Sequence, residues 1–116
     1  MPELERYSLS GLWGITVPRE HGGAGVSRVT LAEVTAIISA ADGSLGQIPQ
    51  NHYYALEVLR VNGNADQQRR FYARALAGER FGNALAETGT RTAAERRTRL
   101  TVDAEGGWRI NGSKFY

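Results

Sequence analysis

The two histidines of this 116-residue sequence are the side chains best suited to exchange a proton near neutral pH. His52 lies among apolar residues at helical spacing, where an imidazole could hydrogen-bond a reacting group or position a substrate. The alternative is a core histidine bonded to a backbone carbonyl, which the spacing alone favours. His21 lies in a glycine-rich turn and is expected at the surface. The two are too far apart in sequence, without acidic residues in register, to predict a metal site.

Three further side chains could contact a substrate. Asn83 lies beside an expected strand, and its amide offers a donor and an acceptor. A turn residue at the end of that strand is the equal alternative. Tyr53 and Tyr54 follow His52 directly, but successive helical residues cannot share one face. We therefore take Tyr53 as the candidate beside a pocket, with core packing as the favoured alternative.

Several other kinds of chemistry are disfavoured. The turn from Gly22 to Gly25 lacks the preceding strand and the lysine of a phosphate-binding loop. The net charge is only +2, and acidic residues accompany both arginine-rich stretches, so we interpret these as solvated faces rather than a nucleic-acid site. The longest apolar run is too short to span a bilayer, and no signal peptide is evident. We expect a soluble cytoplasmic protein that binds neither nucleic acid nor membranes.

The helix that carries His52 should position it through an apolar stripe from Leu45 to Leu59. Ser44 can cap this helix, and Pro49 then lies either in its first turn or at a kink. Gly63 is a suitable C-terminal stop.

Two more helices are expected around it. Ser27 is a plausible N-cap for a helix that ends near Asp42. Asn64 and Gln67 have the spacing of a capping box, which predicts a helix that ends at Gly78.

The pattern changes to that of strands after residue 80. Phe81–Ala86 is expected to be a short strand, followed by a polar loop over Glu87–Arg97. Leu100–Asp103 and Trp108–Ile110 alternate apolar and polar residues with period two. Lys114–Tyr116 is expected to begin another strand.

Turn and packing signals complete this pattern. Gly106-Gly107 and Asn111-Gly112 are turn dipeptides, and the second is a strong hairpin signal. Trp13 and Trp108 are assigned to packing. A run of helices followed by a run of strands predicts two domains in a mainly α, α+β chain. Both ends look cut, so we expect the isolated chain to aggregate or to dimerise by exchanging elements.

Several motifs occur in the order found in one enzyme family. They are Gly11–Pro18, Gly22–Gly25, Ala40–Leu45, Asn62–Gly63, Gln67–Arg69, Leu76–Arg80 and Gly107–Lys114. Together they resemble acyl-CoA dehydrogenases over nearly the whole chain, whereas each alone would be weak. The resemblance implies an N-terminal helical domain over residues 1–80, with a truncated first helix, and the truncated start of the middle β-barrel domain over 81–116.

A finer resemblance lies in Gly46–His52 and Phe81–Thr90. These segments are most similar to reduced-flavin-dependent monooxygenases of sulfur acquisition and desulfurisation, which include the SfnB-type oxidoreductases and the dibenzothiophene monooxygenases. Dehydrogenases usually show Thr-Glu-Pro and then Gly-Ser-Asp after the first strand. Ala86–Thr88 and Arg91–Ala93 stand in their place here, which weakens the acyl-CoA interpretation.

The resemblance implies a flavin-dependent oxidoreductase that oxygenates small organosulfur compounds. It implies a homo-oligomer that uses FMN rather than FAD and is supplied with reduced flavin by a separate flavin reductase. An FAD-dependent acyl-CoA dehydrogenase is one alternative, and a truncated, non-catalytic oligomerisation module is another. The 116 residues alone are expected to be inactive.

The resemblance also assigns roles to residues. It brings the catalytic interpretation of His52 level with the structural one. It places part of the chain in the loop that covers the flavin, where backbone N–H groups could serve the cofactor whatever the side chains are. The cofactor-binding candidates are Asn83, Ala84, Glu87, Thr88 and Thr90, and the substrate-pocket candidates are Tyr53 and Asn83.

Overall fold

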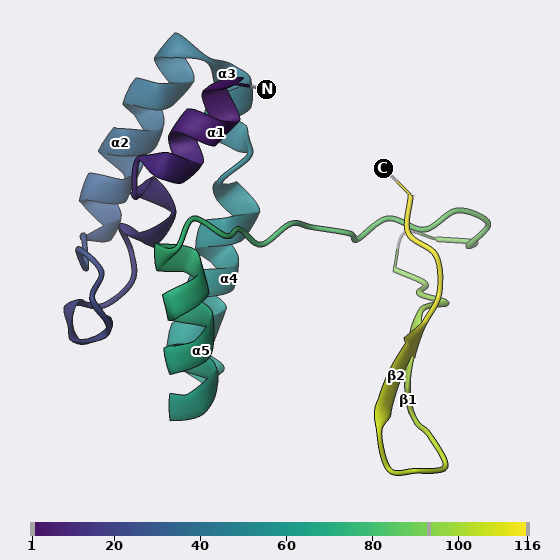
Figure 1. The fold of residues 1–116 in the computed structure, drawn as a ribbon. Coiled ribbons are helices and arrows are strands. Elements are labelled where there is room, and N and C mark those ends of the chain that lie inside the picture. Colours follow the sequence, from purple (N-terminus) through teal and green to yellow (C-terminus); the bar gives the residue numbers. More distant parts are fainter. Residues whose placement is uncertain (1, 93, 116) are drawn as a thin grey trace. The chain divides into compact units, whose positions relative to one another are not determined.

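The computed structural model describes residues 2–92 and 94–115 and contains two compact units, Met1–Gly82 and Asn83–Tyr116 (Figure 1). The units divide after Gly82, whereas the sequence placed the domain boundary after residue 80. Within the described residues, the helices belong to the first unit and the strands to the second. This order of elements confirms the expected fold class, in which helices are followed by the first strands of a β domain.

The first unit is built from five α-helices and two short 3₁₀ helices within its described part. Helix α5 contacts α4, and it also contacts both 3₁₀ helices. The elements in chain order are α1 (Pro2–Leu9), η1 (Leu12–Gly14), η2 (Arg19–His21), α2 (Arg28–Ala41), α3 (Gly43–Gln47), α4 (Gln50–Asn62) and α5 (Ala65–Leu76).

Two of the predicted N-caps are confirmed. The hydroxyl of Ser27 accepts a hydrogen bond from the backbone N–H of Thr30 at the start of α2. At the start of α5, the side chains of Asn64 and Gln67 each accept a bond from the backbone N–H of the other. These reciprocal bonds satisfy donors that the first helical turn leaves without a partner.

The helix expected to begin at Ser44 is in fact two helices. Asp42, rather than Ser44, caps α3, because its carboxylate accepts from the N–H groups of Ser44 and Leu45. Helix α4 begins directly after Pro49. Proline has no N–H to bond the preceding turn, so it separates the two helices.

The core of the helical unit forms around buried aromatic rings. Trp13 and Val17 are completely buried, and Tyr72 and Leu56 are nearly so, which confirms the packing role of Trp13. The glycine-rich turn approaches this core closely, because a Cβ on Gly23 would lie 2.1 Å from the carbonyl oxygen of Val17. The turn is therefore structural, as predicted.

The second unit contains one antiparallel hairpin, β1 (Arg99–Val102) and β2 (Trp108–Asn111). Residues 103–107 form its turn, in which the Asp103 carboxylate accepts from the N–H groups of Glu105 and Gly107. The expectation for Gly106-Gly107 is therefore confirmed. Asn111-Gly112 lies at the end of β2 instead of at a hairpin turn, so that expectation was wrong.

Two other expected strands differ from the structure. Phe81–Ala86 forms no strand, although the N–H of Phe115 donates to the carbonyl of Ala86 at 3.0 Å. A single backbone bond does not make a ladder. Lys114 and Phe115 are likewise outside any strand, and Tyr116 lies outside the described residues.

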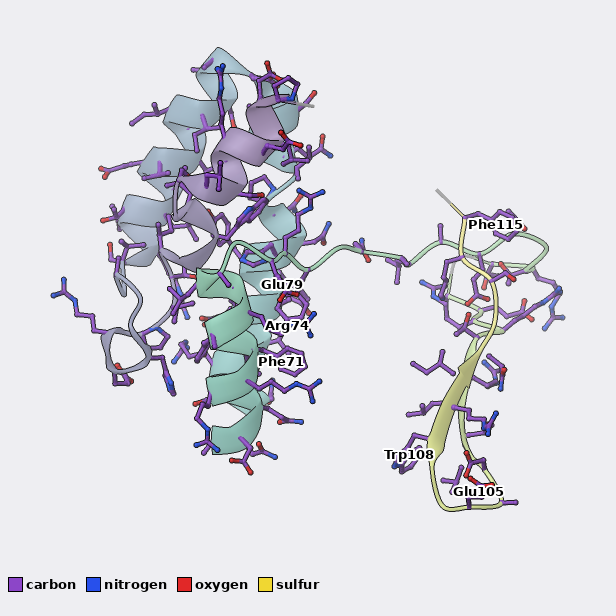
Figure 2. All side chains as sticks on the ribbon, viewed as in Figure 1. Phe71, Arg74, Glu79, Glu105, Trp108 and Phe115 are labelled. Atoms are coloured by element: carbon purple, nitrogen blue, oxygen red, sulfur yellow. The ribbon has the colours of Figure 1, made fainter. Side chains whose placement is uncertain are left out.

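The hairpin has one apolar face. Leu100 pairs with Ile110 and Val102 with Trp108, and residues two apart in a strand point to the same side. All four side chains are exposed, and Trp108, which projects from the hairpin in Figure 2, is 70% exposed. The packing assignment of Trp108 is wrong for this unit, because alternation predicts a strand but not what covers it.

No helix in the part of the chain that the structure describes is both long and apolar enough to cross a membrane.

Candidate functional site

The imidazole of His52, on α4, is completely buried within the helical unit. Its Nε2 lies 2.8 Å from the carbonyl oxygen of Trp13, and its Nδ1 lies 3.1 Å from the backbone nitrogen of Phe81. A carbonyl accepts and an amide N–H donates, so the neutral tautomer with its proton on Nε2 satisfies both bonds. The ring therefore joins η1, α4 and the segment after α5.

Aromatic rings enclose this imidazole. Trp13 meets it edge-on at a centroid distance of 4.8 Å, and the rings of Tyr53 and Phe81 lie 5.6 and 5.9 Å away. Burial lowers the pKa of His52, and the bond to the Trp13 carbonyl opposes this more weakly. Protonation would place a second N–H on Nδ1, facing the N–H of Phe81, so the charged ring would lose that bond. The surroundings hold the imidazole neutral.

This geometry is the core-histidine alternative that the sequence left open for His52. Both ring nitrogens are engaged in the helical unit. A catalytic contact would require one of these bonds to open, and the bond from Phe81 is the longer of the two. The catalytic role of His52 stays a prediction.

Tyr53 ties α1 to the rest of the unit. Its hydroxyl lies 2.9 Å from the carbonyl oxygen of Leu12, to which it donates, so the hydroxyl of Tyr7 at 2.8 Å donates to Tyr53. Burial, followed by the bond with Tyr7, raises the pKa of Tyr53. Tyr54 is exposed, which confirms that the two neighbouring tyrosines do not share a face. Sequence reasoning missed Tyr7, although Leu4 and Tyr7 have helical spacing.

Tyr53 also borders an apolar groove of about 600 Å³ that is lined by α2, α3 and α4. Arg28 on its rim donates to Glu57, and Arg60 binds the same carboxylate. These bonds, Arg60 first and then Arg28, lower the pKa of Glu57 to about 2. The groove can accept an apolar group, with few polar atoms to orient it. Its lining is Arg28, Leu31, Ala32, Thr35, Ala36, Ser39, Gly46, Gln47, Gln50 and Tyr53.

The cofactor-binding candidates lie in the second unit, on a segment that is neither helix nor strand. Asn83, Ala84 and Thr88 are exposed, whereas Glu87 and Thr90 are half-buried. His52 and Tyr53 belong to the other unit. The structure therefore brings His52 and Tyr53 together, and it presents Asn83, Ala84 and Thr88 to solvent.

Glu87 differs from its neighbours, because its side chain is 3% exposed. One carboxylate oxygen accepts from Nζ of Lys114 at 2.5 Å and from the N–H of Thr98 at 3.1 Å. The other accepts from the N–H of Arg97 at 2.5 Å. Lys114 and then the Arg97 N–H hold the pKa of Glu87 well below its usual range. The carboxylate is thus committed to the protein, and Lys114 is a residue that sequence reasoning missed.

The helical unit matches a described family. Residues 3–79 match "Acyl-CoA dehydrogenase, N-terminal domain", which covers more than half of the chain. The chain therefore belongs to the acyl-CoA dehydrogenase family, as its motifs indicated.

The relatives divide into two activities. The chain is 33% identical to a dibenzothiophene monooxygenase of Rhodococcus erythropolis and 34% identical to one of Mycolicibacterium goodii, over 98% of its length in each case. It is 30% identical, over 91% of its length, to a 3-methylmercaptopropionyl-CoA dehydrogenase of Ruegeria pomeroyi (strain ATCC 700808 / DSM 15171 / DSS-3). The matches span 27%, 28% and 18% of these relatives, so the chain corresponds to about a quarter or less of each.

Proposed function

We propose that the chain is part of a flavin-dependent monooxygenase that uses reduced flavin and oxygen to oxygenate a small organosulfur compound. The proposed protein is a cytoplasmic homo-oligomer that binds FMN in preference to FAD and receives reduced flavin from a separate flavin reductase. The observation that carries the proposal is the likeness to dibenzothiophene monooxygenases over 98% of the chain. Dehydrogenase relatives match at lower identity and over a smaller share of the chain.

The exposed segment of the second unit is compatible with a flavin. A flavin ring needs hydrogen-bond partners along its polar edge. Asn83 offers an amide, and Ala84 and Thr88 are exposed and carry further backbone donors and acceptors. We assign the flavin contacts to Asn83, Ala84, Thr88 and Thr90, and for Glu87 to its backbone alone. The cofactor, when bound, would supply the electrons for oxygen activation.

We retain His52 as the candidate catalytic side chain, with one condition taken from its geometry. Its Nδ1 can contact a substrate or flavin atom only after the bond from the Phe81 N–H opens. Until then, His52 holds residue 81 in place, directly before the segment that carries Asn83. Tyr53 is the proposed substrate-pocket residue of the helical unit, because its ring borders the apolar groove.

An FAD-dependent acyl-CoA dehydrogenase is the second candidate. The family match and the likeness to 3-methylmercaptopropionyl-CoA dehydrogenase favour it. The two candidates require different co-substrates, so they can be separated by activity.

The test uses full-length protein titrated with FMN and FAD, followed by two assays. Oxygen uptake with reduced FMN and an aromatic sulfide or sulfone is the expected activity, and reduction of an artificial electron acceptor with an acyl-CoA is the activity of the alternative. The His52→Ala variant is assayed beside the parent, with His21→Ala as the matched control. Oxygen uptake by the His52→Ala variant at the parental rate would overturn the role of His52. Protein that binds neither flavin would overturn both enzyme proposals.

A further inference from the structure

The buried carboxylate of Glu87 connects three stretches of the second unit that are far apart in sequence. It accepts from the backbone N–H groups of Arg97 and Thr98, and it pairs with Lys114. Nζ of Lys114 also lies 3.4 Å from the carbonyl oxygen of Leu85. The three stretches are 85–87, 97–98 and 114–115. Glu87 therefore closes the polar loop that begins at its own position and ends at Arg97.

A backbone bond next to Glu87 reinforces this arrangement. The N–H of Phe115 donates to the carbonyl of Ala86 at 3.0 Å. At the far side, Gly112 approaches Thr98 so closely that a Cβ would lie 2.6 Å from the Thr98 Cα. The backbone next to Glu87 is therefore held by the bond between Phe115 and Ala86 as well as by the ion pair with Lys114.

The burial of this ion pair distinguishes it from the other ion pairs found among the described residues. Side-chain exposure is 3% for Glu87 and 25% for Lys114, whereas the surface pair Arg69 and Asp66 is more than two thirds exposed at both residues. Exposed pairs contribute little to stability, but removing one partner of a buried pair leaves the other charge without compensation. Glu87 and Lys114 therefore matter more to the local structure than the surface pairs do.

We propose that Glu87 is a positioning residue of the flavin site, which acts by fixing the backbone of residues 84–88 and closing the 87–97 loop instead of touching the cofactor. This inference rests on the proposed function. Lys114 is its partner, and the pair sets the path of the segment that carries Ala84 and Thr88. Glutamine cannot replace Glu87, because the carboxylate accepts at both oxygens, whereas an amide accepts at one oxygen and donates at its nitrogen.

Glu95 provides a matched control on the same loop. Its carboxylate accepts from the backbone N–H of Arg91 at 2.8 Å, and its side chain is 36% exposed. Glu95→Gln makes the same chemical change as Glu87→Gln, but water can replace the bond that is lost.

The experiment measures trypsin cleavage and flavin binding in full-length protein and in the Glu87→Gln, Lys114→Arg and Glu95→Gln variants. Trypsin cleaves the peptide bond after Arg97, a residue whose backbone N–H donates to Glu87, so this bond should be protected while Glu87 holds the backbone. The side chain of Arg91 is 92% exposed, so cleavage after Arg91 is the internal reference. We expect Glu87→Gln to raise cleavage after Arg97, relative to cleavage after Arg91, about tenfold. We also expect it to raise the Kd for FMN about tenfold, with a smaller fold-loss in kcat at saturating FMN.

Lys114→Arg keeps the charge and is expected to retain most of the FMN affinity. Glu95 contacts Arg91, so Glu95→Gln is compared with the parent by its absolute rate of cleavage after Arg97 and by its Kd for FMN, and it is expected to match the parent in both. Unchanged cleavage after Arg97 in Glu87→Gln would overturn the closing of the loop. Faster cleavage with an unchanged Kd for FMN would overturn the positioning role. A parent protein that binds no flavin would overturn the proposed function, and the loop closure would then still be judged from the cleavage pattern.

Discussion

In the helical unit, apolar rings are buried and the one buried polar side chain among the described core residues, His52, is neutral. In the second unit, the arrangement is reversed, because Glu87 is buried in an ion pair while the apolar face of the hairpin is exposed. Burial of apolar surface is largely independent of salt and of pH, whereas ion pairs depend on both. The two units should therefore fail under different conditions.

The largest expected effect separates the two tryptophans. Trp13→Ala should lower the free energy of unfolding of the helical unit by about 3–5 kcal/mol, because it empties a completely buried position. Trp108→Ala should change the free energy of unfolding of the second unit by less than about 0.5 kcal/mol, because that side chain is 70% exposed. Urea unfolding measures both losses when it is followed by helical circular dichroism for the helical unit and by resistance to trypsin for the second unit. Equal losses for the two variants would remove the contrast between the units.

The next effect concerns the hydrogen bonds of His52. His52→Leu should lower the free energy of unfolding of the helical unit by about 2–3 kcal/mol, because it leaves the buried carbonyl of Trp13 and the N–H of Phe81 without their partner. His52→Gln should cost less, since its amide can both donate and accept. His21→Gln is the matched control. If His52→Leu is as stable as the parent, the imidazole does not hold these segments together.

How well the fold and the candidate sites could be predicted from the sequence depended on the distance along the chain between interacting groups. The Ser27 cap and the Asn64–Gln67 capping box join residues three apart, and the sequence predicted both correctly. The break between α3 and α4 was one of two alternatives that Pro49 left open. Local signals of this kind are fixed by backbone geometry and need no knowledge of the fold.

The candidate sites were harder to predict, because their partners are distant in sequence. His52 was singled out, but Trp13 is 39 residues before it and Phe81 is 29 residues after it. Glu87 was singled out as a cofactor contact, but its partner Lys114 is 27 residues away. Periodicity indicates which face of an element is buried, and it does not indicate which groups meet there.

A smaller effect should appear as a pH dependence of the helical unit. Because the pKa of His52 is lowered in the folded state, the unfolded chain binds more protons as the pH falls through about 6.5. The stability contributed by neutral His52 is present above that value and should decline by up to about 1.4 kcal/mol per pH unit below it. Urea unfolding at pH 7.5, 6.5 and 5.5 measures this slope. His52→Gln should flatten it, and a parental slope in that variant would show that another group is responsible.

The smallest expected effect sharpens the contrast between a solvated and a buried carboxylate. Glu57 and Glu87 both have lowered pKa values, but the side chain of Glu57 is 42% exposed and that of Glu87 is 3% exposed. Glu57→Gln should therefore lower the free energy of unfolding by less than about 1 kcal/mol at low salt. High salt should abolish this loss, because water and ions can replace the bonds to Arg28 and Arg60.

The sign of the pH effect at Glu57 follows from its pKa of about 2, below the ordinary value of 4.5. Its contribution is present above pH 4.5 and is lost as the pH falls towards 2. Urea unfolding at low and high salt, at pH 7 and pH 3, gives the four values needed. A loss in Glu57→Gln that persists at high salt would mean that exposure does not decide the contribution of a carboxylate in this chain. The distinction between a surface ion pair and the buried pair of Glu87 and Lys114 would then have no energetic basis.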